Sequence, residues 1–551
     1  MDKLLPARFL PFVACLAVFA LALALAISWD SVFWRWVAAA SGLLCIVGLV
    51  DITATRHTLR RNFPVTAHLR TFFEYFRPML RQYVVESDYE EVPFSHMQRS
   101  IAYQRAKNVL DKRPFGTQLD VYATQYEWIN HSLAPAHIDS HDFRIDIGGA
   151  QCRQPYSASV FNISAMSFGS LSANAIRALN EGARRGGFYH DTGEGSISPY
   201  HRENGGDICW EIGSGYFGCR SADGTFNEER FVENAISPQV KMIEIKLSQG
   251  AKPGHGGVLP AAKVSAEISL TRGVPIGVDC VSPAAHSAFS TPLGLLEFVA
   301  RLREKSGGKP TGFKLAIGHP WEWFGIAKAM QQSGILPDFI VVDGGEGGTG
   351  AAPLEFTDHV GAPLREALLL VHNTLVGLNL RDRIRIGASG KVVTAFDLAR
   401  TLALGADWCN AARGFMFALG CIQSLNCHTD RCPTGVATQD PSRWKNLDVP
   451  DKAERVKMFH ENTLKALKEL IAAAGLRHPA EIGPEHVIRR VSSTEVRSLS
   501  ALYPFVKPGE LLGGHPEHHA VFKVFWDAAR TDTFAPPRTV LDAHHTKARA
   551  G

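Results

Sequence analysis

The sequence has little excess charge of either sign and no dense pattern of cysteines. Its formal net charge is +4 over 551 residues and it has no long basic run, which argues against nucleic acid as a partner. Its ten cysteines lack the close, regular spacing of a small secreted disulfide scaffold, so a reducing compartment is expected for most of the chain. Internal repeats and low-complexity segments are also missing. With 45% hydrophobic residues, the chain can form two to four domains, or one large barrel with additions.

Two long apolar runs set the N-terminus apart from the rest of the chain. Residues 9–29 contain no charged residue, and 21 residues can span a bilayer core of about 30 Å as a helix. Residues 36–50 form a second run of only 15 residues, which leaves its crossing of the membrane open. Basic residues flank the pair on both outer sides: Lys3, Arg8, Arg56, Arg60 and Arg61. We therefore expect a hairpin in the inner (cytoplasmic) membrane, with both ends and the remaining body of the chain in the cytoplasm.

A cleavable signal peptide is the alternative for the first run, because Ala24-Leu25-Ala26 resembles a cleavage site. The second apolar run, which follows at once, favours the hairpin. The chain is then expected to have four parts. These are a transmembrane hairpin over 1–62, a mostly helical pre-barrel segment over 63–150, a barrel over 151–440 and a helical C-terminal extension over 441–551.

Short apolar runs alternate with amphipathic segments after Ser157, which predicts a parallel sheet covered by helices. The candidate strands are 159–166, 242–248, 275–280, 312–318, 338–344, 383–389 and 407–413. The candidate helices are 172–185, 291–305, 322–334, 363–378 and 394–405. About eight units over roughly 270 residues match a (β/α)8 TIM barrel better than an open doubly wound sheet. No strong GxGxxG follows the first strand, which also disfavours a dinucleotide-binding fold.

Glycine-rich and polar segments follow five of these strands, where a barrel places its active site. They are MSFGS (166–170), SQGAKPGHGG (248–257), DGGEGGTGAAP (343–353), ASGK (388–391) and ARG (412–414). Glycine lets backbone N–H groups approach a phosphate closely, and the two late segments suit the phosphate site of many barrels. Flavin mononucleotide (FMN) would use such a rim, with its ring over the mouth of the barrel.

Three cysteines lie within twelve residues, Cys421, Cys427 and Cys432, with the spacing C-x5-C-x4-C and a proline after the last. Thiolates are the usual protein ligands of iron–sulfur clusters. Buried structural thiols are the alternative, and zinc, with His428 as a fourth ligand, is a weaker one.

Residues 100–445 resemble the FMN-binding synthase domain of glutamate synthase. The resemblance is carried, in order, by SAMSFGSLS, HDTGEGS, IKLSQGAKPGHGGVLPAAKVS, DGGEGGTGAAPL and LGCIQSLNCHTDRCPTGVATQDP. It implies a barrel that binds 2-oxoglutarate and FMN, and a 3Fe–4S cluster on Cys421, Cys427 and Cys432 that passes electrons to the flavin.

The resemblance also implies roles for single residues. Gln249, Lys252 and Arg272 resemble residues that bind the oxo acid, Ser167 one that contacts flavin and substrate, and Glu194 an acid near the ammonia entrance. Fixed cations suit a dicarboxylate, since guanidinium can grip a carboxylate with two parallel hydrogen bonds. The residues implied to contact FMN are Met166, Ser167, Lys314, Gly348, Thr349, Gly350, Ser389, Gly390, Arg413 and Gly414. Without the resemblance, Arg272 could equally be a helix-end cation and Glu194 a hydrogen-bonded loop acid.

Some features depart from the family pattern. His255 stands where the synthases often have an acid, and SPAAHSAF (282–289) replaces their proline- and histidine-rich loop. Residue 2 is Asp, so no N-terminal cysteine nucleophile is expected, and no NAD(P)H fingerprint is evident. We therefore expect ammonia, rather than glutamine, as the nitrogen source and ferredoxin or another external electron donor.

The expected activity is the reductive amination of 2-oxoglutarate with ammonia to give glutamate. One alternative keeps both cofactors but uses a related amino or oxo acid, such as an N-substituted glutamate. Another is a catalytically silent membrane scaffold, which the intact cysteines and glycine loops disfavour. Homo-oligomers are neither predicted nor excluded by the sequence.

Overall fold

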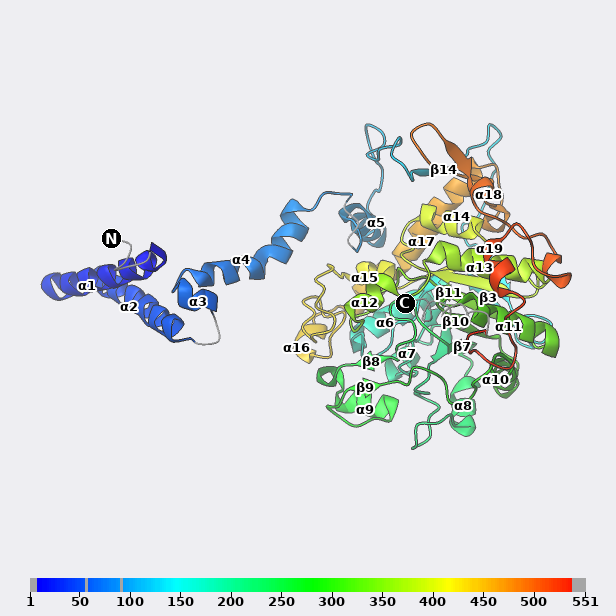
Figure 1. Ribbon diagram of the computed structural model, residues 1–551, viewed down its shortest axis with the longest axis horizontal. Helices are drawn as coiled ribbons and strands as arrows, with labels where there is room; N and C mark the ends of the chain where they lie inside the picture. The colour runs from blue at the N-terminus through cyan, green and yellow to red at the C-terminus, as the bar shows by residue number, and fades with distance from the viewer. Residues whose placement is uncertain (1–6, 55–57, 90–92, 538–551) are drawn as a thin grey trace, which may run out of the picture. The chain divides into compact units, whose positions relative to one another are not determined.

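The computed structural model describes residues 7–54, 58–89 and 93–537. The chain divides into two compact units, Met1–His96 and Met97–Gly551 (Figure 1). Each unit has its own packing and is described separately below.

The first unit contains two long apolar helices, α1 (Leu10–Trp29) and α2 (Val32–Thr53), which lie side by side after a short turn η1 (Ala7–Phe9) (Figure 1). A Cβ on Gly48 would lie 2.2 Å from the ring of Phe12, so this glycine is what lets the two helices approach. With 20 and 22 residues, both helices are long and apolar enough to cross a membrane, by length and composition alone. The short run 36–50 thus lies within a longer helix. The unit continues with α3 (Thr58–Asn62), α4 (Ala67–Leu80) and a π-helical turn η2 (Arg81–Val85).

The second unit is built around a closed barrel of eight parallel strands, which confirms the predicted (β/α)8 fold. Around the barrel the order is β4-β5-β6-β7-β10-β11-β12-β13, and β13 pairs with β4 to close it. The strands are β4 (Phe161–Ile163), β5 (His190–Asp191), β6 (Ile208–Ile212), β7 (Val240–Lys246), β10 (Thr311–Leu315), β11 (Phe339–Asp343), β12 (Arg385–Ser389) and β13 (Trp408–Ala411).

Helices surround these strands, as Figure 1 shows. The longer ones are α6 (Ala173–Gly186), α8 (Glu228–Ala235), α10 (Pro292–Lys305), α11 (Pro320–Ser333), α13 (Leu364–Gly377), α14 (Ala395–Ala403) and α17 (Val449–Ala473). The shorter ones are α7 (Pro199–Arg202), α9 (Ala266–Arg272), α12 (Leu354–His359), α15 (Arg413–Leu419), α16 (Pro441–Trp444), η3 (Ala261–Lys263) and η4 (Pro479–Glu481). The five predicted helices correspond to α6, α10, α11, α13 and α14.

One predicted strand was wrong and two barrel strands were not predicted. Residues 275–280 lie outside the barrel, where Ile276 and Val278 are exposed and Gly277 adopts φ +67°. Only Cys280–Val281 is a strand (β9), paired antiparallel with β8 (Val258–Leu259). The two barrel strands that were not predicted are β5 and β6, because polar residues interrupt their apolar pattern.

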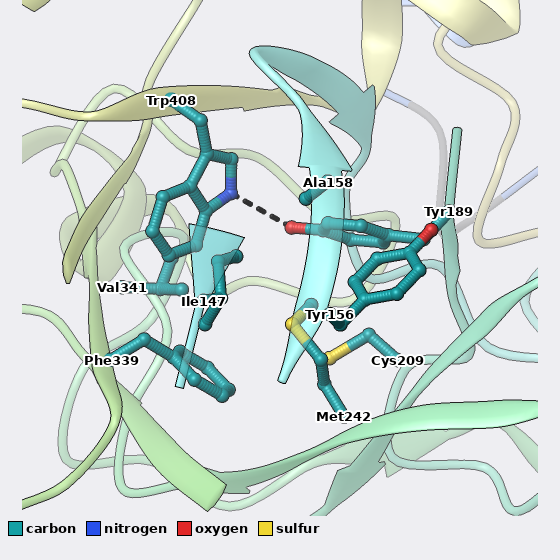
Figure 2. Packing of buried hydrophobic residues seen from close by; sticks show 9 residues of the cluster. All are labelled: Ile147, Tyr156, Ala158, Tyr189, Cys209, Met242, Phe339, Val341 and Trp408. Atoms are coloured by element: carbon teal, nitrogen blue, oxygen red, sulfur yellow. Dashed lines mark hydrogen bonds between the residues drawn. The ribbon is translucent and has the colours of Figure 1, made fainter. Parts of the chain in front are cut away.

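A two-stranded hairpin, β2 (Arg144–Ile147) and β3 (Tyr156–Ser159), closes the amino end of the barrel. Figure 2 shows its apolar side chains packed against residues from the starts of several strands, including Phe339 and Trp408. The indole N–H of Trp408 donates a hydrogen bond to the hydroxyl of Tyr189, at 2.8 Å. This packing leaves the carboxyl end of the barrel for function.

The rest of the second unit covers the outside of the barrel. Helix α17 packs on α6, where Gly182 provides room for Val456, since a Cβ there would lie 2.5 Å from that side chain. A small sheet joins β1 (Glu127–Ile129), β14 (Val487–Arg490) and β15 (Val496–Ser498). The remaining elements are α5 (His96–Ala106, which begins at the unit boundary), α18 (Leu499–Leu502), η5 (Glu510–Leu512) and α19 (Ala520–Phe525).

Candidate active site

Glu194 lies in the loop that follows β5, in a space that only glycine neighbours allow. A Cβ on Gly257 would lie 2.0 Å from its Oε1, and a Cβ on Gly213 would lie 2.7 Å from its Oε2. Its carboxylate forms an ion pair with Lys246 at 3.1 Å. Burial opposes ionisation of Glu194, but Lys246, Arg272 and Lys252 outweigh burial and lower its pKa. Glu194 is therefore a carboxylate at neutral pH.

Three buried cations surround this carboxylate: Lys246 at the end of β7, Lys252 in the following loop and Arg272 at the end of α9. Burial lowers the pKa of Lys252, and the attraction of Glu194 does not compensate. Among the residues that the structure describes, Lys252 Nζ and Arg272 Nε have no hydrogen-bond partner. Such groups are costly to bury unless a ligand pairs with them.

Arg272 is fixed by the loop that follows β4. Its guanidinium donates to Ser167 Oγ at 3.2 Å and to the Phe168 carbonyl at 2.9 Å, and it lies over the ring of Phe217 at 5.2 Å. Gly195 permits this contact, because a Cβ there would lie 2.8 Å from the guanidinium. Arg272 is therefore more than a helix-end cation, since it is held in the interior.

The charge balance of the cluster is positive. Lys246, Lys252 and Arg272 carry three positive charges and Glu194 carries one negative charge, which leaves two positive charges in excess. A buried excess of this size favours a bound dianion. A dicarboxylate would satisfy it with two separate carboxylates.

A small cleft opens beside Glu194 and Lys246. Gln249 and His255 line it from the loop after β7, and Pro283 and Ala284 line it from the segment that differs from the family pattern. The sequence-predicted residues Glu194 and Gln249 thus meet here, with Lys252 close behind. The structure adds two residues that the sequence reasoning missed, Lys246 and His286.

His286 holds the divergent segment to the barrel. Its Nε2 lies 2.8 Å from the carbonyl of Lys246, and its Nδ1 lies 3.1 Å from the hydroxyl of Tyr216. Burial lowers the pKa of His286 to about 4, so the ring is neutral at physiological pH. Its role here is to position the backbone next to the cleft.

Lys314 lies in the barrel interior, in contact with carboxylates from two neighbouring strands. Its Nζ forms ion pairs with Glu211 and, at 3.1 Å, with Glu244. Burial alone would lower its pKa, but Glu211, Glu244 and Asp191 raise it well above the usual value. Lys314 is therefore a permanent cation beneath the carboxyl end of the barrel.

The same interior contains Asp191, Cys209 and Glu244, whose ligand atoms all lie within 4.8 Å of one another. This spacing alone would suit a metal ion. The ammonium group of Lys314 already supplies a cation to these carboxylates, and burial raises the pKa of Glu244 well above its usual value. The trio is therefore better explained as part of a cluster of buried acid groups around a lysine.

Asp191→Asn is expected to weaken the pH dependence of stability. Burial raises the pKa of Asp191 to about 7, with Lys314 opposing and Glu211 adding to the shift. An unfolded aspartate titrates near pH 4, so between about pH 4 and pH 7 the folded state keeps a proton that the unfolded state releases. The unfolding free energy therefore falls as the pH rises through this window. Asparagine cannot titrate, but it can still accept the hydrogen bond that Gly193 N–H donates at 2.9 Å.

Chemical unfolding at pH 5 and pH 7.5 measures this effect. The loss of unfolding free energy between the two values should be smaller in the variant than in the original protein. Equal losses would show that Asp191 does not carry the proton.

The loops after β11, β12 and β13 form a neighbouring rim at the same end. Arg413 donates a hydrogen bond to the Glu346 carbonyl at 2.7 Å, and a Cβ on Gly348 would lie 3.0 Å from its guanidinium. Burial lowers the pKa of Arg413 to about 10, so it stays charged at neutral pH. A buried arginine beside glycine backbone fits a phosphate group.

The other residues implied to contact FMN lie around this rim. Ser389 ends β12, and its hydroxyl donates to Asp343, while Gly390 follows it directly. Thr349 and Gly350 are exposed on the loop after β11, and Gly414 is buried near Phe459. Met166 and Ser167 follow β4, where a Cβ on Gly193 would lie 2.6 Å from the Ser167 nitrogen.

The three cysteines lie next to this rim as free thiols. The cysteine segment contacts the loop after β11 at Gly350, where a Cβ would lie 3.0 Å from the Cβ of Cys427. Burial, with a smaller contribution from the other two sulfurs, raises the pKa of Cys421 to about 12. Burial also opposes ionisation of Cys432, but the Thr434 hydroxyl and nearby backbone N–H groups lower its pKa.

The arrangement of the three cysteine sulfurs does not meet the spacing of a single zinc ion. A tetrahedral zinc site, with Zn–S bonds of about 2.3 Å, needs sulfurs roughly 4 Å apart. Among the residues that the structure describes, the possible ligand atoms of Asp191, Cys209 and Glu244 all lie within 4.8 Å of one another, whereas the three cysteine sulfurs do not.

Lys263 is a second buried lysine that the sequence reasoning missed. Its Nζ donates to the carbonyls of Ser170 and Ala437, at 3.1 and 3.0 Å. It thereby ties the loop after β4 to the segment after the cysteines. It also lowers the pKa of Cys427, against the larger effect of burial.

Comparisons with known proteins bear on the whole of this region. A family model described as a conserved region in glutamate synthase matches residues 122–477. The chain is 37% identical over 501 residues to a protein of Bacillus subtilis named glutamate synthase large subunit-like protein YerD, covering 84% of this chain and 95% of that one. It is 38% identical over 315 residues to the archaeal glutamate synthase (NADPH) of Methanocaldococcus jannaschii, covering 57% of this chain and 58% of that one. The chain thus spans little more than half the length of the archaeal relative.

One solved structure with a similar trace is the flavin-binding domain of baker's yeast flavocytochrome b2. The TM-score is 0.41 and the identity 14%, over 80% of this chain and 89% of that one. This likeness is too remote to bear on the chemistry.

Proposed function

The chain belongs to the glutamate synthase family, and from this premise we propose that it is an FMN-dependent oxidoreductase that aminates 2-oxoglutarate reductively. The balanced reaction converts 2-oxoglutarate, ammonium, two electrons and two protons into glutamate and water. The observation that carries the proposal is the buried excess of two positive charges around Glu194. A dicarboxylate oxo acid would neutralise it.

Different side chains would bind different parts of the substrate. Lys252 and Arg272 would each pair with one carboxylate, since both have unpartnered N–H groups. Glu194 has a lowered pKa, so it suits holding ammonium or an iminium cation better than donating a proton. Gln249 lines the cleft and would orient the amino nitrogen.

FMN fits the rim of the barrel through a buried cation and glycine backbone. Ser389, Gly390, Arg413 and Gly414 would hold its phosphate, with Gly348 to Gly350 beside it. Met166, Ser167 and Lys314 would lie toward its ring. When bound, FMN supplies the two electrons of the reduction.

The cysteines would hold a 3Fe–4S cluster that receives electrons from ferredoxin or another donor. The contact between Gly350 and Cys427 keeps the cysteine loop against the flavin-side loop. We also propose that α1 and α2 form a hairpin in the cytoplasmic membrane, with the barrel in the cytoplasm.

A related amino or oxo acid, such as an N-substituted glutamate, is the second candidate substrate. The observation that favours it is the lining of the cleft by His255, Pro283 and Ala284, where the family pattern is not kept. A longer or differently charged substituent would contact these residues.

A panel of oxo acids separates the two candidates. Anaerobic assays with a reduced viologen and ammonium should give a kcat/KM for 2-oxoglutarate at least about 100-fold above that for pyruvate, which lacks the second carboxylate. A preference for pyruvate would refute 2-oxoglutarate as the substrate. Oxidation of N-substituted glutamates by the same protein with oxidised viologen as electron acceptor, without amination of 2-oxoglutarate, would refute it as well.

A further inference from the structure

Helix α4 and the turn η2 expose a continuous apolar face. Ten large apolar residues have exposed side chains, between 36% and 75%: Leu69, Phe72, Phe73, Tyr75, Phe76, Met79, Leu80, Tyr83, Val84 and Val85. At 100° per residue, six of the seven that belong to α4 fall within one sector of about 120°, and Tyr75 lies about 40° outside it. Exposed apolar faces of this extent mark a contact with another molecule or with lipid.

The opposite face of α4 is polar. Arg70 and Glu74 form an ion pair at 2.7 Å along it, and Thr71 is exposed on it. Arg77 lies at the border between the two faces. Basic residues outnumber acidic ones over residues 58–81, where Arg60, Arg61, Arg70, Arg77 and Arg81 stand against Glu74. A cationic helix with an aromatic face is the pattern of helices that lie in a membrane interface.

The start of α4 is fixed to the end of α2. Asp51, buried in the last turn of α2, accepts hydrogen bonds from Val65 N–H at 3.0 Å and lies 2.9 Å from Nε2 of His68. Val65 also packs over Gly48, whose Cβ would lie 3.2 Å from it. The contacts of Asp51 and Gly48 thus hold the start of the amphipathic helix α4 against the end of the long apolar helix α2.

We propose that α4 and η2 lie in the plane of the membrane surface, with the apolar face in the lipid and the arginines toward anionic headgroups. The contacts of Asp51 with Val65 and His68 would set the depth of α4 in the membrane, because they join α4 to the end of a candidate membrane span. Long arginine stems at the border reach the headgroups from a buried position. This inference rests on the proposed membrane hairpin, which the test below examines separately.

Site-specific photocrosslinking tests the proposal in the full chain, reconstituted into vesicles of phosphatidylcholine and phosphatidylglycerol. p-Benzoylphenylalanine is placed at Phe73 on the apolar face, at Thr71 on the polar face, or at Leu21 in the exposed surface of α1. Phe76 provides a second apolar-face position if the Phe73 variant does not fold. Lipid adducts and protein adducts are then identified by mass spectrometry.

Lipid adducts are expected from positions 21 and 73, with several-fold fewer from position 71. Adducts from position 21 without adducts from position 73 would overturn the interfacial helix and leave the hairpin standing. Adducts from position 73 to protein would assign the face to a second copy or to the rest of the chain, and would also overturn it. No lipid adducts at either position would overturn the hairpin and the interfacial helix together.

Discussion

Lys252→Met is expected to lower kcat/KM for 2-oxoglutarate by about 100- to 1,000-fold while making the ligand-free protein more stable. Removing one partner of a buried charge pair costs about 2–5 kcal/mol, and each 1.36 kcal/mol is tenfold in rate. Lys252 is buried with no hydrogen-bond partner for Nζ among the described residues. Methionine of similar volume relieves that cost, and Lys246 still neutralises Glu194. Steady-state kinetics and thermal unfolding measure the two effects.

Lys263→Met is the matched control, since Lys263 is also buried but donates to two carbonyls. Its loss leaves those carbonyls unpaired, so the unfolding temperature should fall rather than rise. A Lys252→Met variant with full activity, or one that loses stability as Lys263→Met does, would contradict the assignment of Lys252 to the substrate.

Cys427→Ser is expected to abolish the iron–sulfur signals of the purified protein and its turnover with a protein electron donor. A serine hydroxyl is a much poorer iron ligand than a thiolate, and a cluster held by three ligands cannot lose one without loss of metal. Iron analysis and electron spin resonance of anaerobically prepared protein give the result directly. The iron content should fall by about tenfold or more.

Cys152→Ser is the control for this variant. Cys152 Sγ donates a hydrogen bond to the Gly308 carbonyl at 3.3 Å, next to the hairpin at the amino end of the barrel, and serine can donate there as well. The Cys152→Ser variant should keep the iron content of the original protein. Equal iron in both variants, or no iron in the original protein, would remove the cluster from the account.

The barrel could be predicted because most of its strands are nearly continuous apolar runs. Strands β7, β11, β12 and β13 lie within two residues of their predicted bounds. Strand β5 has only two residues, and β6 carries Glu211 within ICWEI, because the barrel interior holds a charged layer that Lys314 neutralises. The sequence 275–280 has the alternation of a strand, but alternation alone does not reveal that both faces are exposed.

The residues that meet in the candidate site could be named from the sequence mainly where they follow a family motif, as at Glu194, Lys252 and Arg272; their roles stay predictions. For Lys246 the sequence contains a separate indication, the alternation of side chains along its strand. Met242, Glu244 and Lys246 alternate along β7, so one inward face carries all three. His286 and Lys263 had no such signal, because their partners are backbone carbonyls from segments distant in sequence.

The most direct test of the central claim is the fate of nitrogen from labelled ammonium. Purified protein, a chemically reduced viologen, [15N]ammonium and 2-oxoglutarate are incubated without oxygen, and the products are analysed by mass spectrometry. The account predicts [15N]glutamate in an amount that matches the reduced viologen consumed, and strongly reduced formation in Lys252→Met. Oxidation of the viologen without labelled glutamate, in protein that contains flavin and iron, would contradict it.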